Sequence, residues 1–161
     1  MPEEAAFVRL IKDNKGILLK VSNIYSNNYE DQKDLYQEIV FQLWKSFDTF
    51  RGDSKISTWV YRIALNTSIS HLRKQKRKGD YVPLQFELYN IADEEDRVLQ
   101  ERMSLVNEHI QKLNVIEKGL IILHLEGKNY DEISVITGFT PTNVGTRLTR
   151  IKQKLKKQIN N

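Results

Sequence analysis

The sequence has 161 residues, enough for one domain or two small ones on a prior of roughly 100–200 residues per domain. Hydrophobic residues make up 40% and charged residues 29%, so we expect a folded chain with a core rather than a disordered one. The net charge is only +4, and the placement of the charges therefore says more about binding partners than their total does.

The composition also excludes several kinds of site. Cysteine is absent, which excludes disulfides, thiolate metal sites and cysteine nucleophiles. His71, His109 and His124 lie too far apart for a local metal-binding motif, and we expect no metal and no cofactor. The acidic start lacks the order of a signal peptide, and no apolar run approaches the roughly 18 residues of a membrane span. We therefore expect a cytoplasmic protein that does not insert into membranes.

Apolar residues follow the helical period along the first half of the chain. Two stripes predict two long helices: Leu35, Ile39, Leu43 and Phe47 in the first, and Trp59, Ile63, Ile69 and Leu72 in the second. A polar loop at residues 50–57 precedes the second helix, which Ser57 or Thr58 opens. The strict alternation that is typical of strands is absent, so the predicted fold class is all-α.

Residues 79–92 differ from their surroundings, because they contain Pro83 and show no helical stripe. An acidic cluster follows at residues 93–96, and negative charge is favoured at the N-terminus of a helix. We therefore predict two small helical domains, at residues 1–78 and 93–161, joined by a linker at residues 79–92.

Three helix-start signals divide the C-terminal domain. Capping boxes begin at Asn114 and Asn129, and Thr140 precedes a proline at the first helical position. Gly127 and Gly138 end the first two of these helices. A short helix, a turn with a glycine and a longer helix together predict a helix-turn-helix.

The last helix carries six Lys and Arg residues, and no acidic residue follows Glu132. Its apolar stripe leaves five side chains on the outward face as candidates for base edges and phosphates in a major groove: Thr142, Asn143, Thr146, Arg147 and Arg150. A solvated helix with cations near its C-terminus is the alternative. The position of this helix within a helix-turn-helix favours DNA binding.

A second basic cluster ends the earlier helix, with five cations among residues 73–78. Together with the polar loop at residues 50–57 and nearby aromatic rings, it is suited to single-stranded or partly opened DNA, although Trp59 also fits an ordinary core position. The net-acidic segment at residues 31–38 would be repelled by DNA. This acidic face suits a protein partner. The alternative is that it is the solvent-exposed first turn of a helix and binds nothing.

Three stretches, in this order and spacing, resemble bacterial RNA polymerase sigma factors of the extracytoplasmic-function (ECF) group. They are DLYQEIVFQLWKSFDTFRG (34–52), KISTWVYRIALNTSISHLRKQKR (55–77) and LNVIEKGLIILHLEGKNYDEISVITGFTPTNVGTRLTRIKQKL (113–155). The resemblance implies a subunit that directs core polymerase to specific promoters and initiates transcription. It implies no covalent chemistry and hence no enzyme.

The resemblance also implies roles for single residues. Asp34, Gln37 and Glu38 would dock on the clamp helices of the largest polymerase subunit, and the flap is a further implied contact on core polymerase. The minus-ten element would be captured as opened strand, with a flipped base at loop 52–57, by Lys55, Ser57, Arg62, Asn66, Arg73 and Lys74. The five outward residues of the last helix would recognise the minus-thirty-five element in duplex DNA. An anti-sigma protein is a further implied partner.

Two departures from the family pattern stand out. Gly145 lies where the family often has a cation, which removes one phosphate contact, and Val60 separates Trp59 from Tyr61, where housekeeping factors have adjacent aromatic residues for melting. Two other functions compete with the resemblance. One is a stand-alone helix-turn-helix regulator that binds duplex DNA as a dimer. The other is a metal-dependent nuclease that uses residues 93–96, which is disfavoured because consecutive carboxylates point in different directions around a helix.

Overall fold

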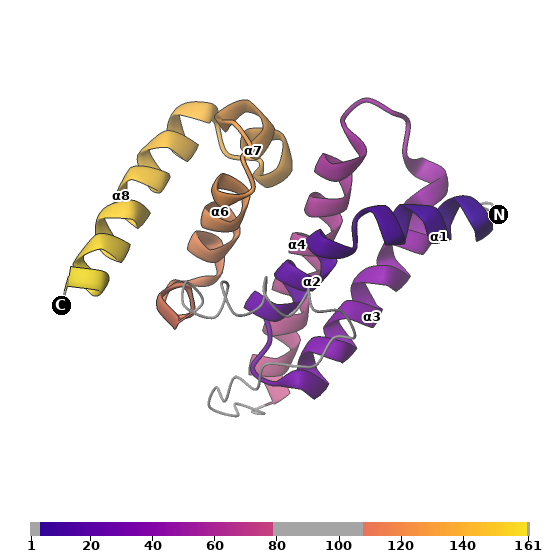
Figure 1. Ribbon diagram of the computed structural model, residues 1–161, viewed down its shortest axis with the longest axis horizontal. Helices are drawn as coiled ribbons and strands as arrows, with labels where there is room; N and C mark the ends of the chain where they lie inside the picture. Colours follow the sequence, from indigo (N-terminus) through magenta and orange to yellow (C-terminus); the bar gives the residue numbers. More distant parts are fainter. Residues whose placement is uncertain (1–3, 79–107, 161) are drawn as a thin grey trace. The chain divides into compact units, whose positions relative to one another are not determined.

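The structure, a computed structural model, describes residues 4–78 and 108–160 (Figure 1). Helices, turns and loops make up these residues, and no strand occurs among them, so the predicted all-α class is confirmed. The chain divides into two compact units, Met1–Gln85 and Phe86–Asn161. The predicted linker at residues 79–92 and the acidic cluster at residues 93–96 lie outside the described residues.

The first unit is a small bundle in which α3 and α4 pack on each other and α2 packs on both. Its elements are α1 (Glu4–Asp13), α2 (Lys15–Ile24), α3 (Tyr29–Ser46), the 3-10 helix η1 (Phe47–Thr49) and α4 (Ile56–Lys78). Leu18 and Val21 of α2 are fully buried against this core. Asn28 caps α3, because its side-chain oxygen accepts the backbone N–H of Asp31 at 2.8 Å.

The buried face of α3 agrees with the sequence pattern, since Leu35, Ile39 and Leu43 are fully buried. The prediction for α4 was wrong in detail. Its helix begins at Ile56, before Ser57 or Thr58, and the four residues of its predicted stripe are only half-buried.

The residues of α4 that form the core are instead Val60, Tyr61, Ala64, Leu65 and Ser68. This helix packs against two neighbours, α2 and α3, so its contact face is wide. Ala64 and Ser68 are completely buried there, because small side chains allow close approach of packed helices. A prediction from the spacing of large apolar residues alone does not identify a buried face that is made of small residues.

The second unit consists of α6 (Val115–Leu125), α7 (Tyr130–Thr137) and α8 (Pro141–Asn160), preceded by a turn of helix at residues 108–110. Both α6 and α7 pack on α8 (Figure 1). The apolar stripe of α8 is buried at Val144, Leu148 and Ile151. The α7–turn–α8 arrangement is the predicted helix-turn-helix.

The predicted capping signals are confirmed at the atomic level. The Asn114 and Asn129 side chains each accept the backbone N–H of the glutamate three residues on, at 2.9 and 2.8 Å, and both glutamates bond back to complete capping boxes. Thr140 Oγ1 accepts the backbone N–H of Asn143 at 3.1 Å. Local side-chain chemistry therefore fixes where all three helices begin.

Gly138 closes α7 in the turn of the helix-turn-helix. Its φ of +85° lies in the left-handed region, which glycine adopts without the steric cost that a Cβ brings. Its N–H donates to the carbonyl of Ser134 at 2.8 Å, and the Ser134 hydroxyl donates to the carbonyl of Phe139 at 2.5 Å. The turn that sets the direction of α8 is thus held on both sides. No helix in the described part of the chain is long and apolar enough to span a bilayer.

Candidate nucleic-acid interface

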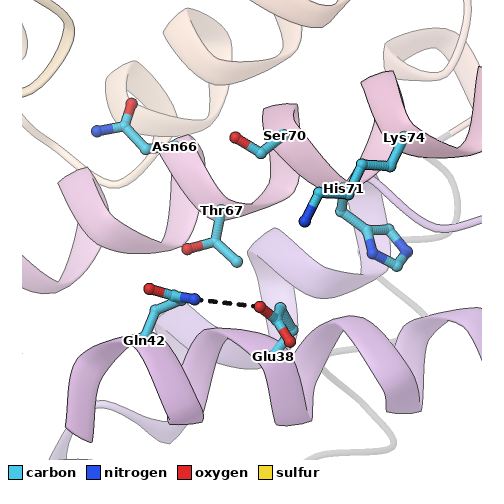
Figure 2. A pocket seen from close by; sticks show the side chains of 7 residues that line it. All are labelled: Glu38, Gln42, Asn66, Thr67, Ser70, His71 and Lys74. Atoms are coloured by element: carbon cyan, nitrogen blue, oxygen red, sulfur yellow. Dashed lines mark hydrogen bonds between the residues drawn. The ribbon is translucent and has the colours of Figure 1, made fainter. Parts of the chain in front are cut away.

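Four residues on one side of α3 form a surface that we call the docking stripe, after the role predicted for three of them: Asp34, Gln37, Glu38 and Phe41. Asp34 and Gln37 are exposed, and Glu38 is half-buried. The Glu38 carboxylate accepts a hydrogen bond from Nε2 of Gln42 at 3.1 Å (Figure 2). These residues recur at helical spacing, so their side chains share one side of α3.

Phe41 is the member of the docking stripe that the sequence analysis missed. Its side chain is 52% exposed, and the ammonium of Lys45 lies 5.7 Å from the centre of its ring. Large exposed apolar side chains within polar faces are typical of protein interfaces. The available signal was its spacing of seven residues from Asp34, outside the buried stripe of Leu35, Ile39 and Leu43.

The predicted DNA residues of the first unit lie on α4 and just before it. Arg62, Asn66 and Arg73 are exposed and fall on one face by the helical period. Lys74 is also exposed and lies beside the groove described below, while Lys55 is exposed and Ser57 is half-buried at the start of the helix. The structure therefore spreads Arg62, Asn66 and Arg73 along one face of α4, with Lys55 and Ser57 at the N-terminal end of the helix, nearest to Arg62. The side chains of residues 75–78 lie outside the described residues.

An aromatic cluster fixes the loop that precedes α4. The Phe50 ring lies 5.2 Å from the Trp59 ring between centroids, and the Phe47 ring lies 6.5 Å from it. Phe7 of α1 adds edge-to-face contacts with Trp44 and Phe47 at 4.9 and 5.6 Å. Trp59, which is half-buried, is therefore partly a packing residue.

Tyr61, two residues after Trp59 in α4, does not line the outward face of the helix. It is 1% exposed and belongs to the core of the first unit. Position 61 lies on the side of α4 that faces α2 and α3, whereas position 62 lies outward. Base stacking at this site therefore cannot involve Tyr61.

A polar groove of about 430 Å³ lies between α3 and α4 (Figure 2). Its lining residues are Glu38, Gln42, Asn66, Thr67, Ser70, His71 and Lys74. Glu38 belongs to the docking stripe and Asn66 to the DNA face. The groove therefore separates the two predicted binding faces of the first unit.

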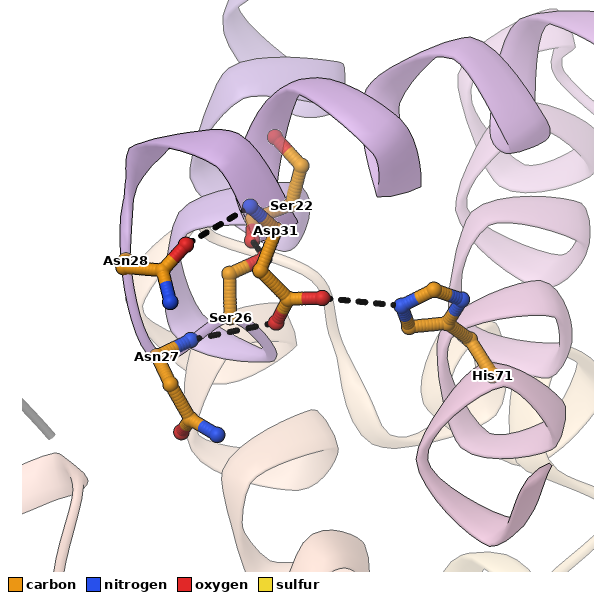
Figure 3. A network of polar contacts seen from close by, with 6 residues as sticks. All are labelled: Ser22, Ser26, Asn27, Asn28, Asp31 and His71. Atoms are coloured by element: carbon orange, nitrogen blue, oxygen red, sulfur yellow. Dashed lines mark hydrogen bonds and ion pairs between the residues drawn. The ribbon is translucent and has the colours of Figure 1, made fainter. Parts of the chain in front are cut away.

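A polar network closes one end of the α3–α4 pair (Figure 3). One Asp31 carboxylate oxygen lies 3.1 Å from Nε2 of His71, and the other accepts the backbone N–H of Asn27 at 3.2 Å. The Ser26 hydroxyl donates to the carbonyl of Ser22 in the preceding turn. Asp31 thus turns toward α4, so within the acidic segment at residues 31–38 the carboxylates left for a partner are those of Asp34 and Glu38.

The outward face of α8 has two kinds of residue. Thr142, Thr146 and Arg150 are exposed, and they follow one another at intervals of four. Asn143 and Arg147 are half-buried and touch each other, with Arg147 Nε donating to Asn143 Oδ1 at 3.2 Å. All five predicted residues lie on the helix that follows the turn.

Phe139 supports Arg147 from the turn before α8. The guanidinium carbon of Arg147 lies 4.4 Å from the centre of the Phe139 ring, within the range of a cation–π contact. With the hydrogen bond to Asn143, this contact holds the arginine in one place before any ligand arrives. Pre-organised arginine loses less side-chain entropy when it binds.

Two basic side chains of the second unit lose their protons more readily than usual. Burial and the nearby positive charge of Lys152 lower the pKa of His124, and burial lowers the pKa of Lys118, whose ammonium donates to Gln111 Oε1 at 3.0 Å. In the first unit, burial raises the pKa of Tyr36. Within residues 4–78 and 108–160, no group of three or more acidic or histidine side chains is arranged to hold a metal ion.

Family comparisons divide the chain at the same two units. The sequence model of Sigma-70 region 2 matches residues 10–78, and that of Sigma-70 region 4 matches residues 105–155. The chain belongs to the sigma-70 family, in its ECF group. As a sigma factor of this group, it directs core RNA polymerase to promoters and initiates transcription. The predicted function is therefore confirmed. Sigma factors of this family are initiation factors that carry out no catalytic step themselves.

Curated relatives agree with this family. The ECF RNA polymerase sigma-E factor of Escherichia coli (strain K12) is 28% identical over 141 residues, which cover 80% of this sigma factor and 74% of the relative. The RNA polymerase sigma factor SigV of Bacillus subtilis (strain 168) is 29% identical over 157 residues, covering 97% and 92%.

Two solved structures share the fold of this sigma factor. The sigma factor RpoE in complex with the anti-sigma factor NepR, from Bartonella quintana, aligns with a TM-score of 0.77 at 19% identity, covering 96% of this chain and 97% of that one. CnrH in complex with the cytosolic domain of CnrY aligns with a TM-score of 0.70 at 19% identity, covering 98% and 90%.

Proposed function

We propose that this sigma factor divides its work between its units. The domain at residues 1–78 docks on core polymerase and captures the opened minus-ten element, and the domain at residues 93–161 recognises the duplex minus-thirty-five element. The observation that carries the proposal is the separation of two faces within the first unit. The docking stripe lies on α3, and the cationic face lies on α4. Polymerase and DNA can therefore be bound at the same time.

The docking stripe has the composition of a protein interface. Asp34 and Gln37 are exposed polar groups, and Phe41 is an exposed aromatic residue beside them. Aromatic residues surrounded by polar groups often carry much of the binding energy of an interface. We assign this stripe to the clamp helices of the largest subunit, and the second unit to the flap.

The α4 face is suited to the opened non-template strand. Arg62, Arg73 and Lys74 are exposed cations that match a phosphate backbone. Asn66 offers both a donor and an acceptor to a base, and Lys55 and Ser57 border the loop at residues 52–57 that would receive a flipped base. Since Tyr61 is buried, base capture depends on this loop and on the exposed part of Trp59.

The α8 face is suited to a major groove. Arg147 is pre-positioned by Asn143 and Phe139, and a bidentate arginine–guanine contact discriminates by about 1–3 kcal/mol. Thr142, Thr146 and Arg150 extend this face. Each DNA contact is weak alone, but joining both on one chain raises the effective concentration of the second.

An anti-sigma protein is a further partner in this proposal. Two structural relatives were solved as complexes, one with the anti-sigma factor NepR and the other with the cytosolic domain of CnrY. The docking stripe is the surface on which such a protein would compete with polymerase. The proposal needs no cofactor or metal, and the protein would act in the cytoplasm, where core polymerase and promoters are found.

Co-elution with purified core polymerase on size exclusion tests the docking assignment. We expect the unaltered chain to form a stoichiometric complex and Asp34→Lys/Glu38→Lys to form none. Asp13→Lys/Glu30→Lys is the matched control, because both residues are exposed acids of the same unit outside the docking stripe. Core binding retained by Asp34→Lys/Glu38→Lys would remove the docking assignment, provided that tryptophan fluorescence shows the first unit to be folded.

A further inference from the structure

Gly145, in the interior of α8, lies directly against the ring of Tyr130 at the start of α7. A Cβ at position 145 would lie 3.1 Å from Cε2 and 3.6 Å from Cδ2 of that ring. The shorter distance is tighter than an ordinary contact, so any other residue there would displace the ring. Glycine is otherwise unfavourable inside a helix. The close approach of Tyr130 accounts for its presence where the family often has a cation.

A shallow hollow of about 520 Å³ lies beside this contact. It is lined by Tyr130, Pro141, Thr142, Gly145, Thr146 and Thr149. We call it the threonine–tyrosine hollow. No charged side chain lines it, although α8 is otherwise basic. Thr142 and Thr146 belong to the face that we propose for duplex DNA, so the hollow opens toward the same ligand.

Two of the threonine hydroxyl groups in the hollow already donate their protons to the helix. Thr146 Oγ1 donates to the carbonyl of Thr142 at 3.1 Å, and Thr149 Oγ1 donates to the carbonyl of Gly145 at 2.9 Å. They have no second proton for a phosphate oxygen, which needs a donor. Their methyl groups, the proline ring and the tyrosine ring remain as contact surface. Because no charged side chain lines the hollow, these apolar surfaces make it better suited to an apolar group than to a phosphate.

In the major groove, the apolar group that a base presents is the C5-methyl of thymine, and threonine methyl groups are among its usual contacts. We propose that the threonine–tyrosine hollow receives the methyl group of a thymine in the upstream promoter element, and that Gly145 and Tyr130 make the hollow specific for it. The inference rests on the proposed function, in which α8 recognises duplex DNA. It names one determinant of promoter choice.

Replacing thymine with uracil tests the inference, because the two bases differ only in this methyl group. Holoenzyme is formed from the full chain and core polymerase, and a promoter that it uses is identified by transcription from genomic fragments. Single deoxyuridine substitutions are then placed across the upstream element of that promoter. At one thymine we expect about a fourfold loss of affinity, the value of one buried methyl group.

Variants of the hollow should remove this thymine preference. Gly145→Arg fills the hollow and Tyr130→Ala removes its wall, so both should bind thymine and uracil promoters equally. Gly145→Arg should also bind every duplex more tightly, because the arginine adds a phosphate contact. The slope of log binding constant against log salt concentration should become steeper by about 0.9, the value of one such contact. Val135→Ala is the control, since Val135 is an exposed apolar residue of α7 outside the hollow, and it should keep the preference.

Gly145→Ala gives a graded version of the test. It improves helix propensity and shifts the Tyr130 ring by only a few tenths of an ångström, so it should fold and lose part of the preference. An active holoenzyme that is indifferent to every uracil substitution would overturn the inference. A uracil effect that survives in both Gly145→Arg and Tyr130→Ala would overturn it as well. A holoenzyme that starts no transcript would contradict the proposed function, and the inference with it.

Discussion

His71 of α4 donates a hydrogen bond from Nε2 to the carboxylate of Asp31, near the start of α3, over 3.1 Å (Figure 3). The side chains are 21% and 11% exposed, respectively. This contact joins α3, which carries the docking stripe, to α4, which carries the face proposed for DNA. It therefore helps to fix the orientation of the two faces relative to each other.

A double-mutant cycle should show that the Asp31–His71 contact stabilises the first unit. Asp31→Asn and His71→Gln should each lower the free energy of unfolding by about 1–2 kcal/mol, because each weakens a charge-assisted hydrogen bond between two partly buried side chains. The double variant should show a coupling of about 0.5–2 kcal/mol. Urea unfolding followed by tryptophan fluorescence measures this in the first unit alone, since Trp44 and Trp59 are the two tryptophans of the chain.

Lys33→Gln is the control for this cycle. Lys33 is exposed on the same helix, and a surface change of this kind should stay within about 0.5 kcal/mol. If the effects of Asp31→Asn and His71→Gln were strictly additive, the contact would not couple α3 to α4.

Phe41→Ala should weaken core polymerase binding by about tenfold or more, as expected for an aromatic residue near the centre of an interface. Folding should be little affected, because the side chain is 52% exposed. Affinity is measured with labelled sigma factor titrated with core polymerase. Val8→Ala, at a 44% exposed apolar residue of α1, should bind as the unaltered chain does. Equal affinities for both variants would place Phe41 outside the interface.

Arg147→Ala should weaken promoter use through the upstream element while core binding is unchanged. The arginine is held by Asn143 and Phe139, so Asn143→Ala should show a smaller loss in the same direction. If Arg147 contacts a guanine, the loss on the correct sequence should be about 1–3 kcal/mol larger than on a mismatched one. Binding of holoenzyme to matched and single-base-changed promoters measures this. An equal loss on every sequence would make Arg147 a phosphate contact only.

The stability of the second unit should fall as the pH falls from about 7 toward 5. Burial and Lys152 lower the pKa of His124 in the folded state, whereas the unfolded chain keeps the ordinary value of about 6.5. Between these values the unfolded state binds more protons, so acid favours unfolding. The contribution of His124 is therefore complete above about pH 6.5 and is lost as the pH passes down to its folded pKa.

Urea unfolding at several pH values, followed by the amide NMR signals of α6 and α8, measures the acid effect. His124→Gln should flatten the pH dependence, and Lys152→Gln should reduce it. A second unit that gains stability as the pH falls through this range would contradict the assignment.

The features that the sequence predicted well depend on neighbouring residues. Asn114, Asn129 and Thr140 each bond to a backbone group three residues away, so the helix starts follow from short segments. The buried stripe of α3 also follows from its period. The helix-turn-helix could therefore be predicted from these short segments alone.

The features that the sequence did not predict depend on contacts between distant elements. Asp31 and His71 are 40 residues apart, and nothing near Asp31 indicates its partner. The core of α4 uses Ala64 and Ser68 because two helices pack on it. Gly145 is explained only by Tyr130, which lies on another helix. Residue type and spacing therefore indicate candidate residues on α3, α4 and α8, but packing decides which of those side chains are exposed.

Transcription from fragmented genomic DNA by core polymerase, with and without the purified chain, tests the central claim most directly. We predict that the chain makes core polymerase start at a small number of sites that share an upstream and a minus-ten element. These starts should disappear with Asp34→Lys/Glu38→Lys and persist with Asp13→Lys/Glu30→Lys. Starts that do not change when the chain is added, together with duplex binding by the chain alone, would contradict the account.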